Sequence, residues 1–331
     1  MSPNSTSGQL WSIILAGGEG TRVSTLVHRW LGRPKPKQYC AFVGTRSMFQ
    51  HTLDRASRLT PPDRMVTVVA HSHRHEALAQ LDGRGGNTIL FQPANRDTAA
   101  GVFLPLTYIR ARAPQATVVL YPSDHFVYPE DRFLQAVRHA VRIAESHPDR
   151  VVMLGVAPDR LELDYGWIQP GQSLADPPDE PVQAVRSFLE KPDATQADAA
   201  LRGGAFWNTL VFATNVDLLW TLGWLCVPDM MPLFDRLSQA IGGPEEGHAL
   251  KAIYRDMPAK NFSSDLLQRV PEKLAVVELT GVLWSDWGKP ERITETLRRI
   301  DRRPAFPLTC LDRPFVPLPI TAAEGGLPMS V

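Results

Sequence analysis

A glycine-rich segment near the start of the chain has the residue types that bind a phosphate chain. It reads LAGGEGTR (15–22) and directly follows an apolar, strand-like run. Glycines let the backbone pass close to phosphates and turn its N–H groups inward, and Arg22 adds a fixed positive charge. Two other glycine motifs fail, because Val23 stands where a dinucleotide fingerprint needs glycine and no Gly-Lys-Ser/Thr follows. The alternative is a tight strand-to-helix turn in which glycine serves geometry alone.

Three further segments hold charged residues suited to phosphate and metal. Lys37 lies in PKPKQ (34–38), where the prolines can hold a lysine over the glycine loop. Asp124 follows a strand-like run, and Asp286 lies in WSDWG (284–288). Mg²⁺ prefers one or two carboxylates together with substrate phosphates, so two converging aspartates would suit phosphoryl-type chemistry. The alternatives are a basic surface turn for Lys37, a helix cap for Asp124 and a turn for Asp286.

The histidines and cysteines favour neither a metal site nor a nucleophile. His71, His73 and His75 alternate where a strand leads into a polar helix start, and nothing nearby completes the four ligands of structural zinc. The cysteines at 40, 226 and 310 are far apart, so we expect no disulfide framework and no CxxC metal site. No GxSxG motif is present either.

Length, charge and hydropathy narrow the class of protein. The chain has 331 residues, of which 44% are apolar and 21% charged, an ordinary globular composition. Lysine plus arginine and aspartate plus glutamate both number 35, and this balance argues against a nucleic-acid partner. The first ten residues carry no secretory signal, and Asn215 and Asp217 interrupt the most apolar stretch, 210–227. We therefore expect a soluble, cytoplasmic protein that does not cross a membrane.

The elements that must position these residues alternate regularly in the first half of the chain. Short apolar runs rich in β-branched residues alternate with helical stretches, which is typical of a parallel sheet covered by helices on both faces. Ligands of such sheets bind beyond the carboxyl ends of the strands, where the glycine loop and Asp124 would lie. We expect strands at Trp11–Ala16, Met65–Ala70, Thr88–Phe91, Thr117–Tyr121 and Val151–Val156, and helices at Ser47–Arg58, Arg74–Leu81, Asp97–Arg112 and Glu130–Glu145.

The second half of the chain is less regular. We expect strands at Val182–Leu189, Trp207–Ala213 and Leu274–Leu279, and helices at Thr195–Arg202, Val216–Leu225, Met231–Ala240 and Pro290–Ile300. Six prolines from Pro304 to Pro328 exclude a single helix over the last thirty or so residues. This tail is expected to wrap the surface or to be partly disordered.

Together these motifs resemble the sugar-1-phosphate nucleotidyltransferase family, and within it most closely the mannose-1-phosphate guanylyltransferases. The resemblance covers about residues 11–290 and rests on motifs in the family's order: LAGGEGTR (15–22), PKQ (36–38), QPANRDTAA (92–100), YPSDH (121–125), YGWI (165–168), FLEKPD (188–193), FWN (206–208) and WSDWG (284–288). It implies an α/β fold, with a Rossmann-like, mostly parallel sheet flanked by helices and a smaller mixed sugar-binding lobe.

The resemblance also implies an organisation and a role for each matching residue. A nucleotidyltransferase domain at 11–300, with a nucleotide-binding half at 11–150 and a sugar-binding half at 151–300, lies between a polar tail at 1–10 and a proline-rich tail at 301–331. The phosphate-binding loop is matched by Leu15, Gly17, Gly18, Gly20, Thr21 and Arg22, and the segment near base and ribose by Gln92, Asn95, Arg96 and Thr98. The sugar side is matched by Gly166, Glu190, Lys191 and Asn208, and the Mg²⁺ ligands by Asp124 and Asp286. The implied catalytic residues are Arg22, Lys37 and Lys191.

The sequence departs from the family pattern at several positions. It reads TRVSTL (21–26) where the family has TRLxPL, and RDTAA (96–100) where the family has RNTAP. Leu210 replaces the glycine of WNSG, and SxDYAVME appears only as SSDLLQRV (263–270). The last two changes lie on the sugar side, so they concern the identity of the sugar more than nucleotide transfer. The chain ends before any appended isomerase domain or β-helix, so we expect no bifunctional isomerase–transferase.

The implied reaction joins an NTP, with GTP favoured, to a sugar 1-phosphate, with mannose 1-phosphate favoured, and releases pyrophosphate with Mg²⁺ as cofactor. One alternative is a uridylyl-, thymidylyl- or cytidylyltransferase acting on another sugar phosphate or a related acceptor. Another is a non-catalytic nucleotide-sugar sensor, which would be expected to lack Arg22, Lys37, Asp124 or Asp286, and all four are present. The expected partners are the two substrates, with a homodimer as the candidate assembly and neither nucleic acid nor membrane.

Overall fold

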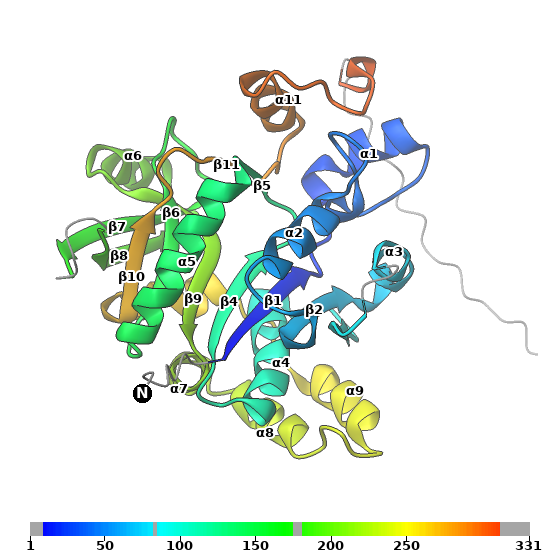
Figure 1. The fold of residues 1–331 in the computed structure, drawn as a ribbon, viewed down its shortest axis with the longest axis vertical. Helices are drawn as coiled ribbons and strands as arrows, with labels where there is room; N and C mark the ends of the chain where they lie inside the picture. The colour runs from blue at the N-terminus through cyan, green and yellow to red at the C-terminus, as the bar shows by residue number, and fades with distance from the viewer. Residues whose placement is uncertain (1–8, 82–84, 175–180, 312–331) are drawn as a thin grey trace, which may run out of the picture.

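A nine-stranded sheet runs through the middle of the molecule (Figure 1). The computed structural model describes residues 9–81, 85–174 and 181–311. The strands of this sheet are β1 (Leu10–Ala16), β2 (Met65–Ala70), β3 (Thr88–Gln92), β4 (Thr117–Pro122), β6 (Val151–Val156), β7 (Gly166–Ser173), β8 (Gln183–Glu190), β9 (Phe206–Asn215) and β10 (Leu274–Glu278). Their order is β3-β2-β1-β4-β9-β6-β10-β8-β7. A separate ribbon pairs β5 (Phe126–Tyr128) with β11 (Leu283–Ser285).

The directions of the strands correct one expectation. β3, β2, β1 and β4 run parallel, and so do β6 and β10. β9, however, lies antiparallel between β4 and β6, and β8 and β7 add further antiparallel pairs. The sheet is therefore mixed, and a mostly parallel sheet is not confirmed. The apolar pattern of β9 indicates a buried strand, but its direction depends on partners far away in the sequence.

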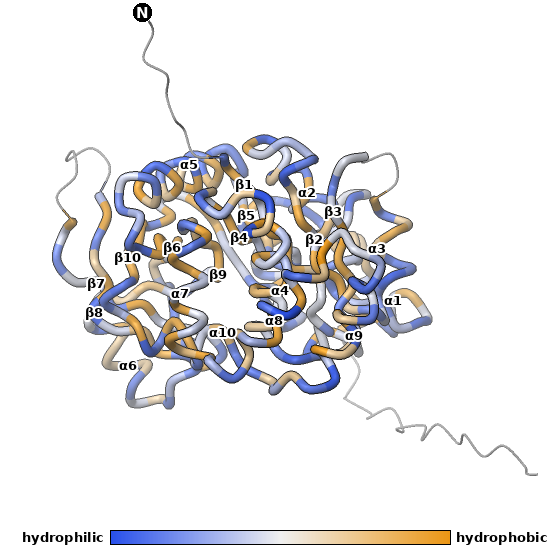
Figure 2. The backbone as a smooth tube through the Cα atoms, turned by 90° about the horizontal axis from the view of Figure 1, so that it is seen from below, coloured by the Kyte–Doolittle hydropathy of each residue, from blue (hydrophilic) through white to orange (hydrophobic). Residues whose placement is uncertain are grey.

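Helices cover both faces of this sheet. They are α2 (Met48–Ser57), α3 (Arg74–Gln80), α4 (Asp97–Arg112), α5 (Glu130–Ser146), α6 (Ala194–Arg202), α7 (Val216–Cys226), α8 (Met231–Ser238), α9 (Glu246–Asp256) and α10 (Phe262–Asp265), while α1 (Ser24–Leu31) and α11 (Pro290–Arg299) pack apart from the two faces. Successive side chains of a strand point to opposite faces, so Ile13 packs in the core that contains α4 and Ile14 in the core that contains α2 and α5. Figure 2 shows hydrophilic stretches prominent on the outer loops.

Every strand and helix expected from the sequence occurs, with ends that differ by no more than two residues. Several elements were not expected, namely α1, α9, α10, the strand β7, which pairs with both β8 and β9, and the ribbon of β5 and β11. In β7, Pro170 and Gly171 interrupt the apolar pattern on which such expectations rest. Over the described residues, no helix is both long and apolar enough to span a bilayer.

A third, smaller apolar cluster joins the two ends of the described chain. It combines residues of α1, α11 and the segment 40–48 with Trp287 and Phe306. The first part of the proline-rich tail packs here, since the amide of Ala305 donates to the carbonyl of Phe42 (2.8 Å), while 312–331 lie outside the described residues. Figure 1 shows α11 at the top of the molecule, near α1. The cluster therefore fixes α11 beside the helix that follows the glycine loop.

Replacing Phe212 by alanine should show how strongly β9 ties the sheet to its helices. Phe212 is 1% exposed and its ring stacks on Phe262 with centroids 5.5 Å apart. Losing a buried ring costs about 3–5 kcal/mol, so the variant should unfold at a clearly lower urea concentration. Leu225→Ala is the matched control, because Leu225 is 62% exposed. Equal urea midpoints for the two variants would contradict this view of the core.

Candidate active site

The carboxyl ends of β1 and β4 bring the glycine loop and Asp124 together. The two strands pair in parallel, and beyond them the amide of Ser123 donates to the carbonyl of Leu15 (3.0 Å). The loop that follows β1 therefore lies beside the loop that follows β4. This is the edge at which ligands of such sheets bind, as the sequence predicts.

The segment PKQ packs against the glycine loop and donates hydrogen bonds to its backbone carbonyls. The side-chain amide of Gln38 donates to the carbonyls of Ala16 (3.1 Å) and Gly18 (2.8 Å), and the hydroxyl of Tyr39 donates to that of Ala16 (3.0 Å). Gly20 has φ +61°, and a methyl group there would lie 2.7 Å from the Cβ of Lys37. Glycine is thus required at 20 both by the backbone conformation and by the close approach of Lys37.

Lys37 connects the two predicted metal-binding aspartates. Its Nζ lies 2.8 Å from Oδ2 of Asp124 and also donates to the backbone carbonyl of Asp286. The Lys37 side chain is 4% exposed, so this cation is buried between two segments that are distant in the sequence. A buried lysine beside a carboxylate gives the site a fixed positive charge next to a fixed negative one.

The carboxylate of Asp286 is held by four donors. Oδ1 accepts from the hydroxyl of Tyr165 (2.7 Å), from Nη1 of Arg292 (2.8 Å) and from the amide of Gly288 (2.9 Å). Oδ2 accepts from Nη2 of Arg22 (3.0 Å). Burial opposes ionisation, but the nearby cations of Lys37 and Arg292 outweigh it and hold the pKa of Asp286 well below its ordinary value. Asp286 is therefore an anion at neutral pH.

Asp124 is also an anion. Burial opposes this too, but the charge of Lys37 lowers the pKa of Asp124 below its ordinary value despite the nearby Asp286. Burial lowers the pKa of His125 itself, so its imidazole is mostly neutral at neutral pH. Both carboxylates are therefore ionised: Oδ2 of Asp124 pairs with Lys37, and the two oxygens of Asp286 pair with Arg292 and Arg22.

These two carboxylates fit a hard divalent cation. Oδ1 of Asp286 has three donors already, whereas Oδ2 has only Arg22, whose side chain is 49% exposed. In the part of the chain that the structure describes, no three His, Cys, Asp or Glu residues gather as a metal site. Two carboxylate oxygens completed by phosphate oxygens is the ligand set that Mg²⁺ favours. Asp124 and Asp286 are thus suited to a metal that binds together with a phosphate ligand.

A pocket of about 170 Å³ opens beside the glycine loop. Among its lining residues are Leu15, Gly17, Gly18, Gln92, Asn95 and Thr98, all of which the sequence assigns to nucleotide binding. Gln92 is oriented by a hydrogen bond to the hydroxyl of Tyr254 (3.0 Å), and Thr98 accepts from the amide of Phe262 (2.8 Å). Gly20 and Thr21 lie where the loop enters α1.

Arg96 lies apart from this pocket. Its Nε donates to the carbonyl of Tyr254 (2.8 Å) and its Nη2 to that of Arg255 (3.1 Å). The guanidinium therefore binds the carboxyl end of α9, where the helix dipole favours a positive charge. Of the predicted base and ribose residues, Arg96 is the one whose side chain is engaged elsewhere.

The predicted sugar residues gather around Gly166. A methyl group on Gly166 would lie 2.9 Å from Oε2 of Glu190 and 3.2 Å from Cβ of Asn208, so these two side chains meet over the glycine. Burial raises the pKa of Glu190. Lys191 is exposed, and its amide donates to the carbonyl of Tyr165 (3.3 Å). Leu210, in place of the family glycine, has φ +57°, a conformation that is strained for leucine.

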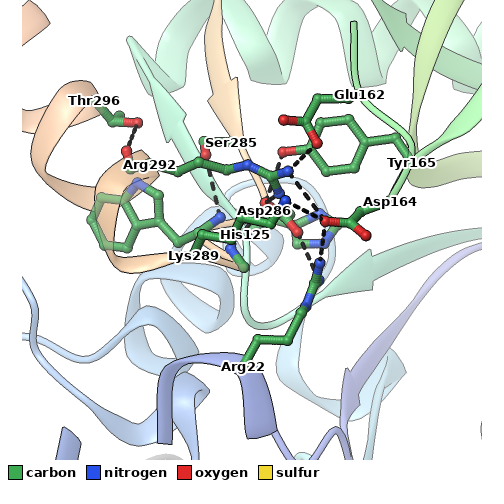
Figure 3. Close-up of polar contacts among 12 residues, drawn as sticks. Arg22, His125, Glu162, Asp164, Tyr165, Ser285, Asp286, Lys289, Arg292 and Thr296 are labelled. Carbon is green, nitrogen blue, oxygen red and sulfur yellow. Dashed lines mark hydrogen bonds and ion pairs between the residues drawn. The ribbon is translucent and has the colours of Figure 1, made fainter. Parts of the chain in front are cut away.

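Apart from Tyr165, which belongs to the YGWI motif, the polar and charged residues around Asp286 are not predicted by the sequence motifs (Figure 3). They are Glu162, Asp164 and Tyr165, which precede β7, and Lys289 and Arg292, which belong to α11 and the turn before it. Arg22 lies 3.3 Å from Asp164, which also pairs with Lys289 (2.8 Å). One signal was available: Glu162 and Asp164 alternate directly before the YGWI motif.

Comparison with known proteins supports a single family. A family model described as nucleotidyl transferase matches residues 11–223, which include the glycine loop, Lys37 and Asp124. A mannose-1-phosphate guanylyltransferase from Klebsiella pneumoniae is 29% identical over 84% of this chain and 58% of its own length. One from Escherichia coli is 27% identical over 85% of this chain and 60% of its own. The chain thus spans about three fifths of the length of these relatives.

A solved structure from Thermus thermophilus, described as a mannose-1-phosphate geranyltransferase, has the same fold. Its TM-score is 0.72 at 24% identity, and the match covers 86% of this chain and 79% of that one. At this identity the likeness bears on the fold alone.

The Gly20→Ala variant tests the geometry of the loop. A side chain at φ +61° costs about 1–2 kcal/mol, and the new methyl group must also displace Lys37. We expect a lower urea midpoint, measured by circular dichroism. Gly247→Ala in α9 is the control, because a Cβ there meets no atom within 4 Å. An unchanged midpoint for Gly20→Ala would show that the loop does not rest on Lys37.

Proposed function

Because the chain belongs to the nucleotidyl transferase family, we propose that it transfers a guanylyl group from GTP to mannose 1-phosphate. The products are GDP-mannose and pyrophosphate. The single observation that carries the proposal is the meeting of Arg22, Lys37, Asp124 and Asp286 beside the glycine loop and its pocket. The choice of GTP and mannose 1-phosphate is supported by the names of the relatives.

The reaction needs no nucleophile from the protein. An oxygen of the sugar phosphate, already an anion at pH 7, attacks the α-phosphorus in line, and the bond to the pyrophosphate oxygen breaks. Catalysis then consists of positioning and of neutralising charge. This agrees with a site that is rich in fixed cations and carboxylates.

Each part of the site has a place in this reaction. The glycine-loop amides and Arg22 bind the leaving pyrophosphate, and Lys37 neutralises the α-phosphate. The base and ribose occupy the pocket lined by Gln92, Asn95 and Thr98. The sugar hydroxyls meet Glu190 and Asn208 beside Gly166, and the exposed Lys191 reaches the sugar phosphate.

Asp124 and Asp286 would hold Mg²⁺ as the cofactor. When bound there, Mg²⁺ would supply positive charge to the α-phosphate and to the attacking oxygen. Arg22 has two roles in this arrangement. It pairs with Oδ2 of Asp286, and its half-exposed guanidinium would bind phosphate in place of that oxygen.

Two other functions remain candidates on specific observations. The first is transfer of another nucleotide to another sugar phosphate. It is favoured because Leu210 and Val270 replace the family's glycine and glutamate on the sugar side. The second candidate is a regulatory homologue without activity, although the four residues whose loss would mark it, Arg22, Lys37, Asp124 and Asp286, are all present. We take the cytoplasm as the location and a homodimer as the assembly within the same proposal.

Pyrophosphate release across a grid of NTPs and sugar 1-phosphates tests the proposal. We expect the strongest signal with GTP and mannose 1-phosphate in the presence of Mg²⁺. Lys37→Met should lower kcat roughly 10²–10³-fold, as the loss of one transition-state charge contact does. Lys35→Met is the matched control, because Lys35 pairs with Glu76 (3.1 Å) outside the site.

The other outcomes of this grid are equally informative. Activity with a different NTP or a different sugar 1-phosphate would support nucleotidyl transfer but would assign another substrate to the protein. Nucleotide-sugar binding without any activity would contradict the proposal and support the regulatory homologue.

A further inference from the structure

We propose that Arg292 is a positioning residue that holds Asp286 in the orientation required to bind a divalent cation. Arg292 lies on α11, is not among the residues that line the nucleotide pocket, and has no part in the reaction proposed above. The inference rests on the proposed function, because it concerns the same cation site. It adds a residue that none of the sequence motifs includes.

The buried Arg292 side chain contacts four other residues that hold it in one position. Its side chain is 6% exposed, and its Nη1 donates to Oδ1 of Asp286 (2.8 Å). Its Nη2 pairs closely with Glu162 and lies 3.5 Å from Asp164. The guanidinium carbon lies 4.6 Å from the centre of the Tyr165 ring. A planar guanidinium can make these contacts at once, whereas an ammonium on a single stem cannot.

The hydrogen bond from Arg292 helps to set the orientation of the Asp286 carboxylate. Arg292 donates to the same oxygen as the Tyr165 hydroxyl (2.7 Å) and the Gly288 amide (2.9 Å), so Oδ1 is saturated. Rotation of the carboxylate would break all three hydrogen bonds. Oδ2 is therefore directed to the partner that can leave, the half-exposed Arg22 (Figure 3). Oδ2 of Asp286 is therefore already oriented to bind a cation that enters the site together with phosphate.

Attachment of α11 does not require a buried arginine. The loop before β7 already pairs with α11 and the turn before it through exposed residues, namely Asp159 with Arg299 (2.9 Å), Arg160 with Glu295 (2.7 Å) and Asp164 with Lys289 (2.8 Å). A buried ion pair stabilises little, because desolvation offsets its attraction, and an apolar side chain often serves as well. What distinguishes Arg292 from the exposed pairs is its contact with Asp286.

Arg292→Lys, compared with Arg160→Lys, tests this role. Both variants keep the charge and change the same residue type in contacts between the same loop and helix. Loss of a residue that orients a metal ligand costs roughly 10–100-fold in metal affinity or activity. We expect Arg292→Lys to raise the half-saturating Mg²⁺ concentration by that factor, with the KM for GTP unchanged and kcat largely restored by excess Mg²⁺. Arg160→Lys should match the wild type.

Binding of Mn²⁺ provides a readout that is independent of turnover. Electron paramagnetic resonance with MnCl₂ and protein saturated with GTP, without sugar phosphate and with Mn²⁺ and GTP alone as the baseline, should give a Kd roughly tenfold weaker, or more, for Arg292→Lys than for the wild type. Tyr165→Phe, which removes one donor to Oδ1 without changing the charge, should shift the Kd in the same direction. It also keeps the test decisive if Arg292→Lys does not fold.

The outcomes separate this inference from the proposed function. Wild-type Mn²⁺ affinity and Mg²⁺ dependence in the folded variants would overturn the positioning role, and so would a loss of kcat that excess Mg²⁺ does not restore. A wild-type protein that binds no Mn²⁺ would overturn it as well. A wild type that binds Mn²⁺ but transfers no nucleotide would contradict the proposed function, while the Mn²⁺ comparison would still decide the role of Arg292.

Discussion

A buried, ionised carboxylate at Asp286 is the constraint around which the site is arranged. An anion removed from water must be compensated by cations and donors, or it takes up a proton instead. Here Arg22, Arg292, Tyr165 and the Gly288 amide bind the carboxylate, while Lys37 binds the backbone of the same residue and the side chain of Asp124. These groups come from four separate parts of the chain, near residues 22, 37, 165 and 290, so the whole fold is needed to assemble them.

The architecture of the chain follows from this need. The parallel strands β1 and β4 deliver the glycine loop and Asp124 to one edge, and β11 leads into Asp286 at the same edge. The third apolar cluster packs Trp287 and α11 against α1. As a result, Arg292 binds Oδ1 of Asp286 and Arg22 binds Oδ2 of the same carboxylate. Trp287 itself has φ +45°, so strained backbone lies directly beside the carboxylate.

The sequence predicts the elements better than it predicts their arrangement. Short apolar runs and helical stretches located β1, β4 and α4 because such patterns are local, but the antiparallel insertion of β9 depends on pairing across about a hundred residues. Gly17, Lys37 and Asp124 were found because their motifs are short and chemically specific. Arg292 was not, because on a strongly amphipathic helix a basic residue reads as part of a solvated face. Arg96 matched a motif, yet its contacts with α9 could not be read from it.

Carbon-13 NMR of the aspartate carboxyl groups, followed through a pH titration of the ligand-free protein, tests the central claim most directly. The account predicts that Asp286 and Asp124, assigned with the Asp→Asn variants, stay ionised down to pH values below the ordinary aspartate pKa of about 4. A folded pKa lowered in this way stabilises the protein above about pH 4, and the stabilisation is lost as the pH falls further. A carboxyl signal of either residue that titrates above about pH 5 would contradict the account, because the cations would then not hold the carboxylates ionised.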